Sequence, residues 1–108
     1  MTLNLRGVVL KGRSGTEYPF SVWLRATRFL PKGGVYVMAR TTGPDQFEMV
    51  FIGETADMSK RPINPAKTAC FDQHGVDSIF SLDEPEAPRR ADIVRDLLMA
   101  INPVCNRD

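Results

Sequence analysis

The fold is decided by residues 34–53, whose sequence is GVYVMARTTGPDQFEMVFIG. Segments 34–40 and 47–52 are rich in β-branched and aromatic residues, which favour strands. Between them, Gly43-Pro44-Asp45 is typical of a turn. This stretch therefore predicts a β-hairpin, with an antiparallel sheet as the basis of the fold.

A second hairpin is predicted on the N-terminal side, with strands at 7–11 and 16–23. Gly12-Arg13-Ser14-Gly15 separates them, and glycine supplies the positive φ of a tight reversal. Because Pro19 cannot donate a ladder hydrogen bond, we expect strand 16–23 at the edge of the sheet. Its alternation places three residues on one face and is typical of a half-buried strand: Tyr18, Phe20 and Val22.

Mostly helical patterns follow the hairpin at 34–53. A short helical turn is predicted near 56–61, capped by Thr55 or Asp57. A helix is predicted over 65–74, between Asn64-Pro65 at its start and Gly75 at its end. A strand over 76–82, an acidic linker over 83–88 and a helix from 88 to 101 follow. The last helix carries an apolar stripe that is typical of a core-facing helix: Ile93, Val94, Leu97, Leu98 and Ile101. Hairpins with appended helices predict an α+β fold, a small, mostly antiparallel sheet flanked by helices.

Length and charge restrict the possible functions. The chain has 108 residues and 12.1 kDa, so we expect one domain, 1–108. Fourteen basic and thirteen acidic residues give a net charge of +1, which excludes polyanion binding by bulk charge alone. No apolar run approaches the roughly 20 residues that span a bilayer. The start lacks the pattern of a signal peptide, so we expect a cytoplasmic protein without a membrane partner.

The two cysteines, Cys70 and Cys105, lie 35 residues apart without a CxxC motif. A disulfide scaffold or a structural zinc site is therefore not expected, which agrees with a reducing cytoplasm. His74 is the only histidine and shares a helix face with Cys70. A Cys–His nucleophilic pair stays open. The favoured interpretation is a buried cysteine beside a histidine that interacts favourably with the helix dipole.

One constellation carries chemistry. Gly34-Val35-Tyr36 opens one strand, Phe51-Ile52-Gly53 closes the next, Arg61 follows, and the tail contains Asn102-Pro103-Val104-Cys105-Asn106. Over about 33–106 this pattern resembles the GIY-YIG endonuclease superfamily. Within this resemblance, 33–106 is the core of the domain and the hairpin at 1–30 is an N-terminal extension.

The resemblance implies a phosphodiesterase mechanism with one divalent metal, Mg²⁺ or Mn²⁺. Tyr36 matches the tyrosine near the attacking water, and Arg61 matches the arginine that neutralises the phosphate. A glutamate on the last long helix holds the metal in the superfamily. These parts suit phosphoryl chemistry because a metal acts as a Lewis acid and a guanidinium binds phosphate in two places.

Two positions depart from the superfamily pattern. Phe51 stands where a tyrosine is usual, and Val94 stands where the metal glutamate is expected. Valine cannot bind a hard cation, which requires oxygen ligands. Glu54 is the remaining candidate carboxylate, although a solvated loop glutamate is the simpler interpretation.

We therefore expect a nuclease-superfamily domain with a degenerate metal site and with DNA or another nucleic acid as its partner. Arg40, Lys60 and Lys67 are candidates for a phosphate-facing patch, although scattered surface charge is the commoner meaning. Trp23 and Phe29 are either a stacking platform or core residues. The alternatives are an active metal-dependent endonuclease that uses Glu54 or another carboxylate, and a non-catalytic protein-interaction module.

Overall fold

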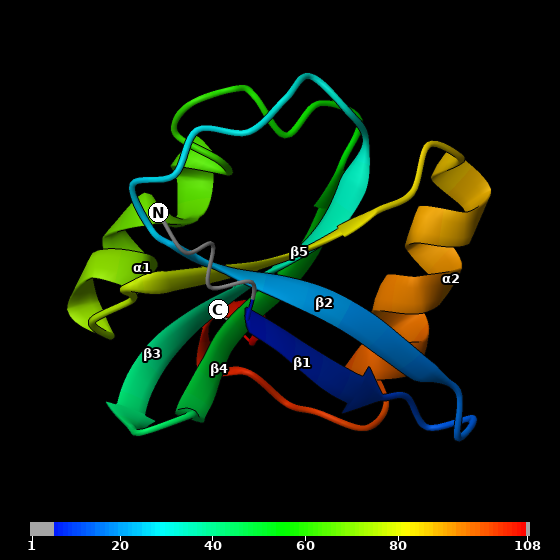
Figure 1. Cartoon of the computed structure of the whole chain (residues 1–108), viewed down its shortest axis with the longest axis horizontal. Coiled ribbons are helices and arrows are strands. Elements are labelled where there is room, and N and C mark those ends of the chain that lie inside the picture. Colours follow the sequence, from blue (N-terminus) through cyan, green and yellow to red (C-terminus); the bar gives the residue numbers. More distant parts are fainter. Residues whose placement is uncertain (1–5, 108) are drawn as a thin grey trace.

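The structure is a computed structural model that describes residues 6–107. Five strands form one antiparallel sheet in the order β1-β2-β5-β3-β4 (Figure 1). The strands are β1 (Arg6–Lys11), β2 (Glu17–Leu24), β3 (Gly34–Gly43), β4 (Gln46–Thr55) and β5 (Ser78–Asp83). The helices are the 3-10 helix η1 (Pro65–Lys67), α1 (Thr68–Gln73), α2 (Ala87–Leu98) and the 3-10 helix η2 (Val104–Asn106). The predicted α+β class, a small antiparallel sheet flanked by helices, is confirmed.

The two helices α1 and α2 lie on opposite faces of the sheet (Figure 1). Strand β3 contributes to both faces, because successive side chains of a strand point in opposite directions. Val35 and Val37 pack with Ile93 and Leu97 of α2. Tyr36 and Met38 belong to the other cluster, which also contains residues of α1 and of the C-terminal segment. Each face of the sheet therefore has its own core.

The N-terminal hairpin joins the same sheet, because β2 pairs with β5 from Ser21↔Ser81 to Leu24↔Ser78. The prediction that this strand lies at the sheet edge is therefore wrong. Pro19 is tolerated because it lies outside the part of β2 that pairs with β5, although it lies opposite Val9 of β1. A central strand can hold proline where no ladder bond is required of it. The first five residues of the predicted extension, 1–5, lie outside the described residues.

The helical turn predicted near 56–61 is wrong, because this segment is an irregular loop. The Asp57 carboxylate accepts hydrogen bonds from the backbone N–H and the hydroxyl of Ser59, at 2.8 and 2.6 Å. The Thr55 hydroxyl oxygen likewise accepts a bond from the backbone N–H of Asp57 at 3.2 Å. These local side-chain bonds give the backbone an alternative to a helix.

The helix boundaries in the second half of the chain also differ from the predicted ones. The helix predicted over 65–74 consists of η1 followed by α1. Asn64, the residue that precedes η1, has a left-handed backbone with φ 56°. Asparagine is one of the few residues that adopt this conformation readily. The predicted C-terminal Gly75 is left-handed as well, with φ +67°. The last helix ends at Leu98 rather than at residue 101. Its apolar stripe faces the core as predicted, and the structure shows that it packs on β3 and β4.

A disulfide joins Cys70 of α1 to Cys105 of η2, so the expectation of no disulfide is wrong. Spacing along the sequence did not reveal it, because the two cysteines meet only when the C-terminal segment crosses the α1 face of the sheet. None of the helices within residues 6–107 is long and apolar enough to cross a membrane.

Candidate functional site

A pocket of about 420 Å³ lies where β3 begins and β4 ends. The loop that connects β4 to η1 forms its other wall. Its lining includes four candidate site residues from the sequence: Tyr36, Glu54, Lys60 and Arg61. The other lining residues are Thr55, Asp57, Pro62, Ile63, Asn64 and Pro65. The signature strands and the arginine that follows them therefore share one hollow of the surface.

Tyr36 lines this pocket and is only 3% exposed. Its hydroxyl oxygen accepts a bond from the Asn64 amide at 3.3 Å. Burial raises the pKa of Tyr36, the Asn64 bond opposes this shift, and the nearby charge of Glu54 adds to it. The phenol therefore stays protonated at neutral pH and offers a hydroxyl, not a phenolate.

The two signature glycines allow close approaches of neighbouring groups, Gly53 to Tyr36 and Gly34 to β5. A Cβ at Gly53 would lie 2.8 Å from the Tyr36 hydroxyl oxygen and 2.6 Å from the ring of Phe51. A Cβ at Gly34 would lie 2.7 Å from the backbone oxygen of Leu82 in β5. All three distances are shorter than a Cβ atom permits, so packing explains the glycine at each of the two positions.

Arg61 lies in the loop and joins it to the segment after β2. Its guanidinium donates to the backbone oxygens of Thr27 and Arg25, at 3.1 and 3.2 Å. Within residues 6–107, no carboxylate forms an ion pair with it. The guanidinium is thus held by neutral acceptors and keeps its charge available at the pocket.

The carboxylates at the pocket already have partners. Glu54 accepts a 2.7 Å bond from the Nε of Arg90, whose side chain is only 7% exposed. The same guanidinium donates to the backbone oxygens of Glu84 and Pro85. Asp57 is bound by Ser59, and the Ser59 hydroxyl bond is the largest cause of its lowered pKa.

Arg90 was missed by the sequence analysis. It stands on α2 one turn before Val94, on the same side of the helix as the apolar stripe. An arginine on the apolar side of a helix predicts a partner for its charge, because arginine is rarely buried without one. Here its presence indicates that a carboxylate, Glu54, faces α2 from the end of β4.

The pocket does not fit a divalent metal. Val94, where the resemblance predicts the metal glutamate, packs against the core cluster under α2. The neighbouring residue that contacts Glu54 is a cation, Arg90. Among residues 6–107, the one group with metal-ligand spacing is Cys70, His74 and Cys105, and none of these lines this pocket.

The three predicted phosphate-patch residues lie in different places. Lys60 lines the pocket beside Arg61. Arg40 is near the far end of β3, paired with Glu48 of β4 at 3.1 Å. Lys67 is half-buried on η1 and does not line the pocket. The structure therefore brings one of these cations to Tyr36 and Arg61, and places the other two elsewhere.

Trp23 and Phe29 border a second hollow of about 220 Å³. Their rings meet edge to face with centroids 6.0 Å apart, and the indole N–H donates to the Ser81 hydroxyl. Trp23 is 36% exposed, while Phe29 is half-buried against the α1-side core. The pair thus belongs partly to the core and partly to the surface.

No family model, no curated protein and no solved structure matches this chain. The resemblance to the GIY-YIG superfamily therefore stays a prediction that rests on the signature residues.

Proposed function

We propose that this chain is a GIY-YIG-like domain that binds nucleic acid at the pocket of Tyr36, Lys60 and Arg61 and has no single-metal nuclease activity. One observation carries the proposal. The pocket gathers the tyrosine, the arginine and a carboxylate expected of such a site, while α2 carries Val94 at the expected metal-ligand position and pairs its Arg90 with Glu54 of the pocket.

The balance of charge at the pocket supports phosphate binding. Its two cations, Lys60 and Arg61, are exposed, and neither forms an ion pair with a carboxylate of the described chain. The carboxylates beside them are engaged by Arg90 and by Ser59. A phosphate diester carries the complementary charge, and a guanidinium can bind two of its oxygens.

The same contacts argue against metal-dependent cleavage. A hard cation requires carboxylate oxygens, and a cation at Glu54 would be repelled by the buried guanidinium of Arg90, which already binds one of its two oxygens. The neutral phenol of Tyr36 is also a poor base for activating water. An active endonuclease that uses Glu54 is for these reasons the weaker alternative.

The first test is binding to labelled duplex and single-stranded DNA, followed by fluorescence anisotropy at several salt concentrations. We expect affinity to fall linearly with the logarithm of salt concentration. Arg61→Ala and Lys60→Ala should each lower the salt slope by about 1, since each removes one phosphate contact. Arg95→Ala is the matched control, because Arg95 is an exposed arginine of α2 outside the pocket.

The outcomes separate the alternatives. Absence of binding at low salt, or equal slopes for the pocket variants and Arg95→Ala, would overturn the proposal. Cleavage of plasmid or branched DNA with Mg²⁺ or Mn²⁺ that is lost in Glu54→Gln would instead establish the active endonuclease. Binding without cleavage is the expected result.

A protein-interaction module is the second candidate, favoured by exposed apolar side chains around the hollow at Trp23. Leu24 and Leu30 are 77% and 67% exposed. NMR titration with DNA discriminates it: shifts at the pocket support nucleic-acid binding, and unmoved peaks favour the module.

A cytoplasmic location remains part of our proposal. It requires that Cys70 and Cys105 be reduced in the cell, which thiol alkylation and mass spectrometry of the freshly isolated protein would reveal.

A further inference from the structure

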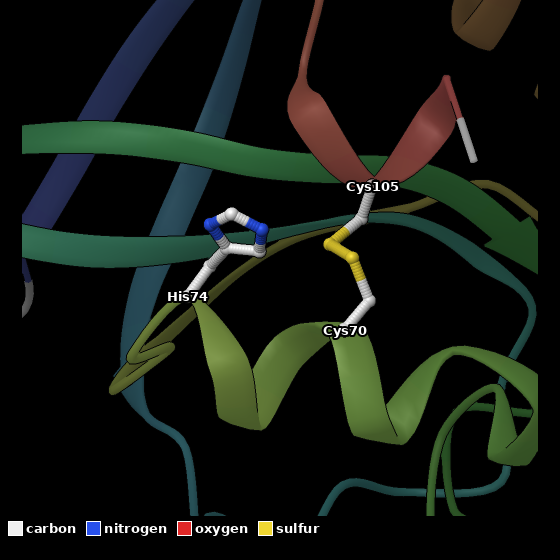
Figure 2. Close-up of side chains that lie close together, drawn as sticks. All are labelled: Cys70, His74 and Cys105. Carbon is white, nitrogen blue, oxygen red and sulfur yellow. A yellow bond between two sulfur atoms is a disulfide. The ribbon is translucent and has the colours of Figure 1, made fainter.

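We propose that Cys70, His74 and Cys105 form a redox-controlled zinc site, which binds one Zn²⁺ when the Cys70–Cys105 disulfide is reduced. Each residue offers one ligand atom, and these atoms all lie within 4.8 Å of one another. Figure 2 shows the imidazole of His74 beside the two sulfur atoms. This inference is independent of nucleic-acid binding.

The local fold explains why the three side chains converge. Cys70 and His74 are four residues apart, so both project from the same side of α1 and its C-terminal cap. The backbone N–H of His74 donates to the backbone oxygen of Cys70 at 3.1 Å, which continues the helical turn through this spacing. Cys105 comes from η2 on the opposite side (Figure 2).

Both halves of the site are anchored by contacts other than the disulfide. On the α1 side, Phe71 is 2% exposed within the core cluster. On the η2 side, the Asn106 amide pairs with both backbone groups of Ile52 in β4, at 2.8 and 2.9 Å. Reduction breaks neither set of contacts. The two thiols therefore remain facing each other beside the imidazole.

The ligand set selects the metal. Zn²⁺ prefers thiolate and imidazole ligands at about 2.3 and 2.0–2.1 Å in a tetrahedron, so ligand atoms within 4.8 Å of one another require only small movements. Three protein ligands leave a fourth position for water. His74 is half-buried, so solvent and metal can reach the site from its side, while Cys105 is fully buried.

The reaction balances with a dithiol reductant. The reductant transfers two electrons and two protons to the disulfide, becomes a disulfide itself and leaves two cysteine thiols. Binding of Zn²⁺ then releases the two thiol protons as both sulfurs coordinate the metal. A disulfide oxidant reverses the sequence: it accepts two electrons from the cysteine sulfurs and two protons, becomes a dithiol, and leaves the Cys70–Cys105 disulfide, whose S–S bond removes both thiolates and so expels the metal. Either form links α1 to the C-terminal segment.

The test is anaerobic titration of the reduced protein with Zn²⁺, and with Co²⁺ as a spectroscopic substitute. We expect one metal per chain and a thiolate-to-cobalt charge-transfer band. Because His74 is the only histidine, its ring signals in NMR should shift on Zn²⁺ binding without ambiguity. The oxidised protein should bind no metal at this site.

Variants identify the ligands. His74→Ala retains the disulfide for folding and, once reduced, should weaken Zn²⁺ binding by more than the roughly 10–100-fold typical of losing an outer hydrogen-bond partner. Asp72→Asn, an exposed change on the same helix, should bind as the wild type does. If Cys70→Ser does not fold, the oxidised wild type replaces it as the form without thiolates.

Two results would overturn the proposal. One is a reduced wild type that takes up no stoichiometric metal, whether it stays folded by circular dichroism or unfolds without recovery when Zn²⁺ is added. The other is equal affinity in the wild type and His74→Ala. Unfolding on reduction that Zn²⁺ reverses would support the site, because the metal would then replace the disulfide.

Discussion

The two faces of the sheet are stabilised in different ways. The α2 face has a core made by regular elements, in which the apolar stripe of one helix packs on alternate residues of β3 and β4. The α1 face is covered by a short helix and irregular segments that are tied down by a disulfide and by side-chain bonds to the backbone. Tyr36 and Ile63 belong to this second core and also line the pocket.

This contrast indicates where the fold accommodates a site. A periodic helix face buries its own apolar residues and leaves few backbone groups unpaired. The irregular segments on the α1 face are instead held by polar side chains that bond to the backbone. Polar side chains of this kind can also face a ligand. The pocket accordingly lies along the wall built from the loop after β4.

The largest effects are expected from one core truncation on each face. Phe71→Ala should lower the free energy of unfolding by about 3–5 kcal/mol and Leu97→Ala by about 2–5 kcal/mol, as measured by urea denaturation. Only Phe71→Ala should disturb the pocket, because Phe71 contacts Phe51 and Phe51 contacts Tyr36, with ring centroids 5.4 and 6.0 Å apart. NMR shifts at Tyr36 check this. Equal perturbation of Tyr36 in both variants would contradict the separation of the two faces.

Reduction of the disulfide should have the next largest effect. Opening a 35-residue link removes a constraint on the unfolded chain that is worth about 3–4 kcal/mol. The measurement compares urea denaturation of the oxidised and reduced protein, with a chelator present to exclude metal. Hydrogen exchange should rise first in α1 and η2 and least in α2. Uniform loss of protection across both faces would show that the crosslink acts on the whole domain.

The smallest effect concerns pH and the α2 face. Asp96 of α2 accepts bonds from the hydroxyls of Ser14 and Tyr18, at 2.7 Å each, and thereby joins α2 to the N-terminal hairpin. The Ser14 hydroxyl, and then that of Tyr18, lowers the pKa of Asp96. Its contribution to stability is therefore present above the ordinary aspartate pKa and is lost as pH falls through the lowered value.

Asp96→Asn should consequently weaken the protein slightly at neutral pH and reduce the loss of stability on acidification. Thermal unfolding measured from pH 7 downward gives this comparison. Asp92→Asn is the control, because Asp92 is an exposed carboxylate of the same helix that contacts only Arg95 among the described residues. If Asp96→Asn and the wild type lose stability identically as the pH falls, other carboxylates determine the loss of stability in acid.

The contrast between the faces also separates what the sequence could predict from what it could not. The β-branched and aromatic residues of β3 and the apolar stripe of α2 are local patterns, so both elements, and the buried face of α2, were predicted. Pro19 misled the prediction of the edge strand, because only the neighbours of β2 determine which of its N–H groups need a partner. No local pattern carries that information.

The irregular face was predicted poorly for a related reason. The bonds of Asp57 and Ser59 compete with a helix over a few residues, and propensity alone does not decide that competition. The disulfide and the Arg90–Glu54 pair join residues 35 and 36 positions apart. Such contacts depend on the tertiary fold. For the pocket, the sequence identified Tyr36, Glu54, Lys60 and Arg61 as candidates, and the structure places them in one lining.

The Asn106 side chain has a consequence for self-association. β4 is the last strand at one side of the sheet, and an outer strand offers unpaired N–H and C=O groups on which another chain can add as a further strand. Asn106 occupies both groups of Ile52 with its amide, as a neighbouring strand would. The C-terminal segment therefore blocks the middle of this edge against intermolecular strand pairing and the aggregation that follows from it.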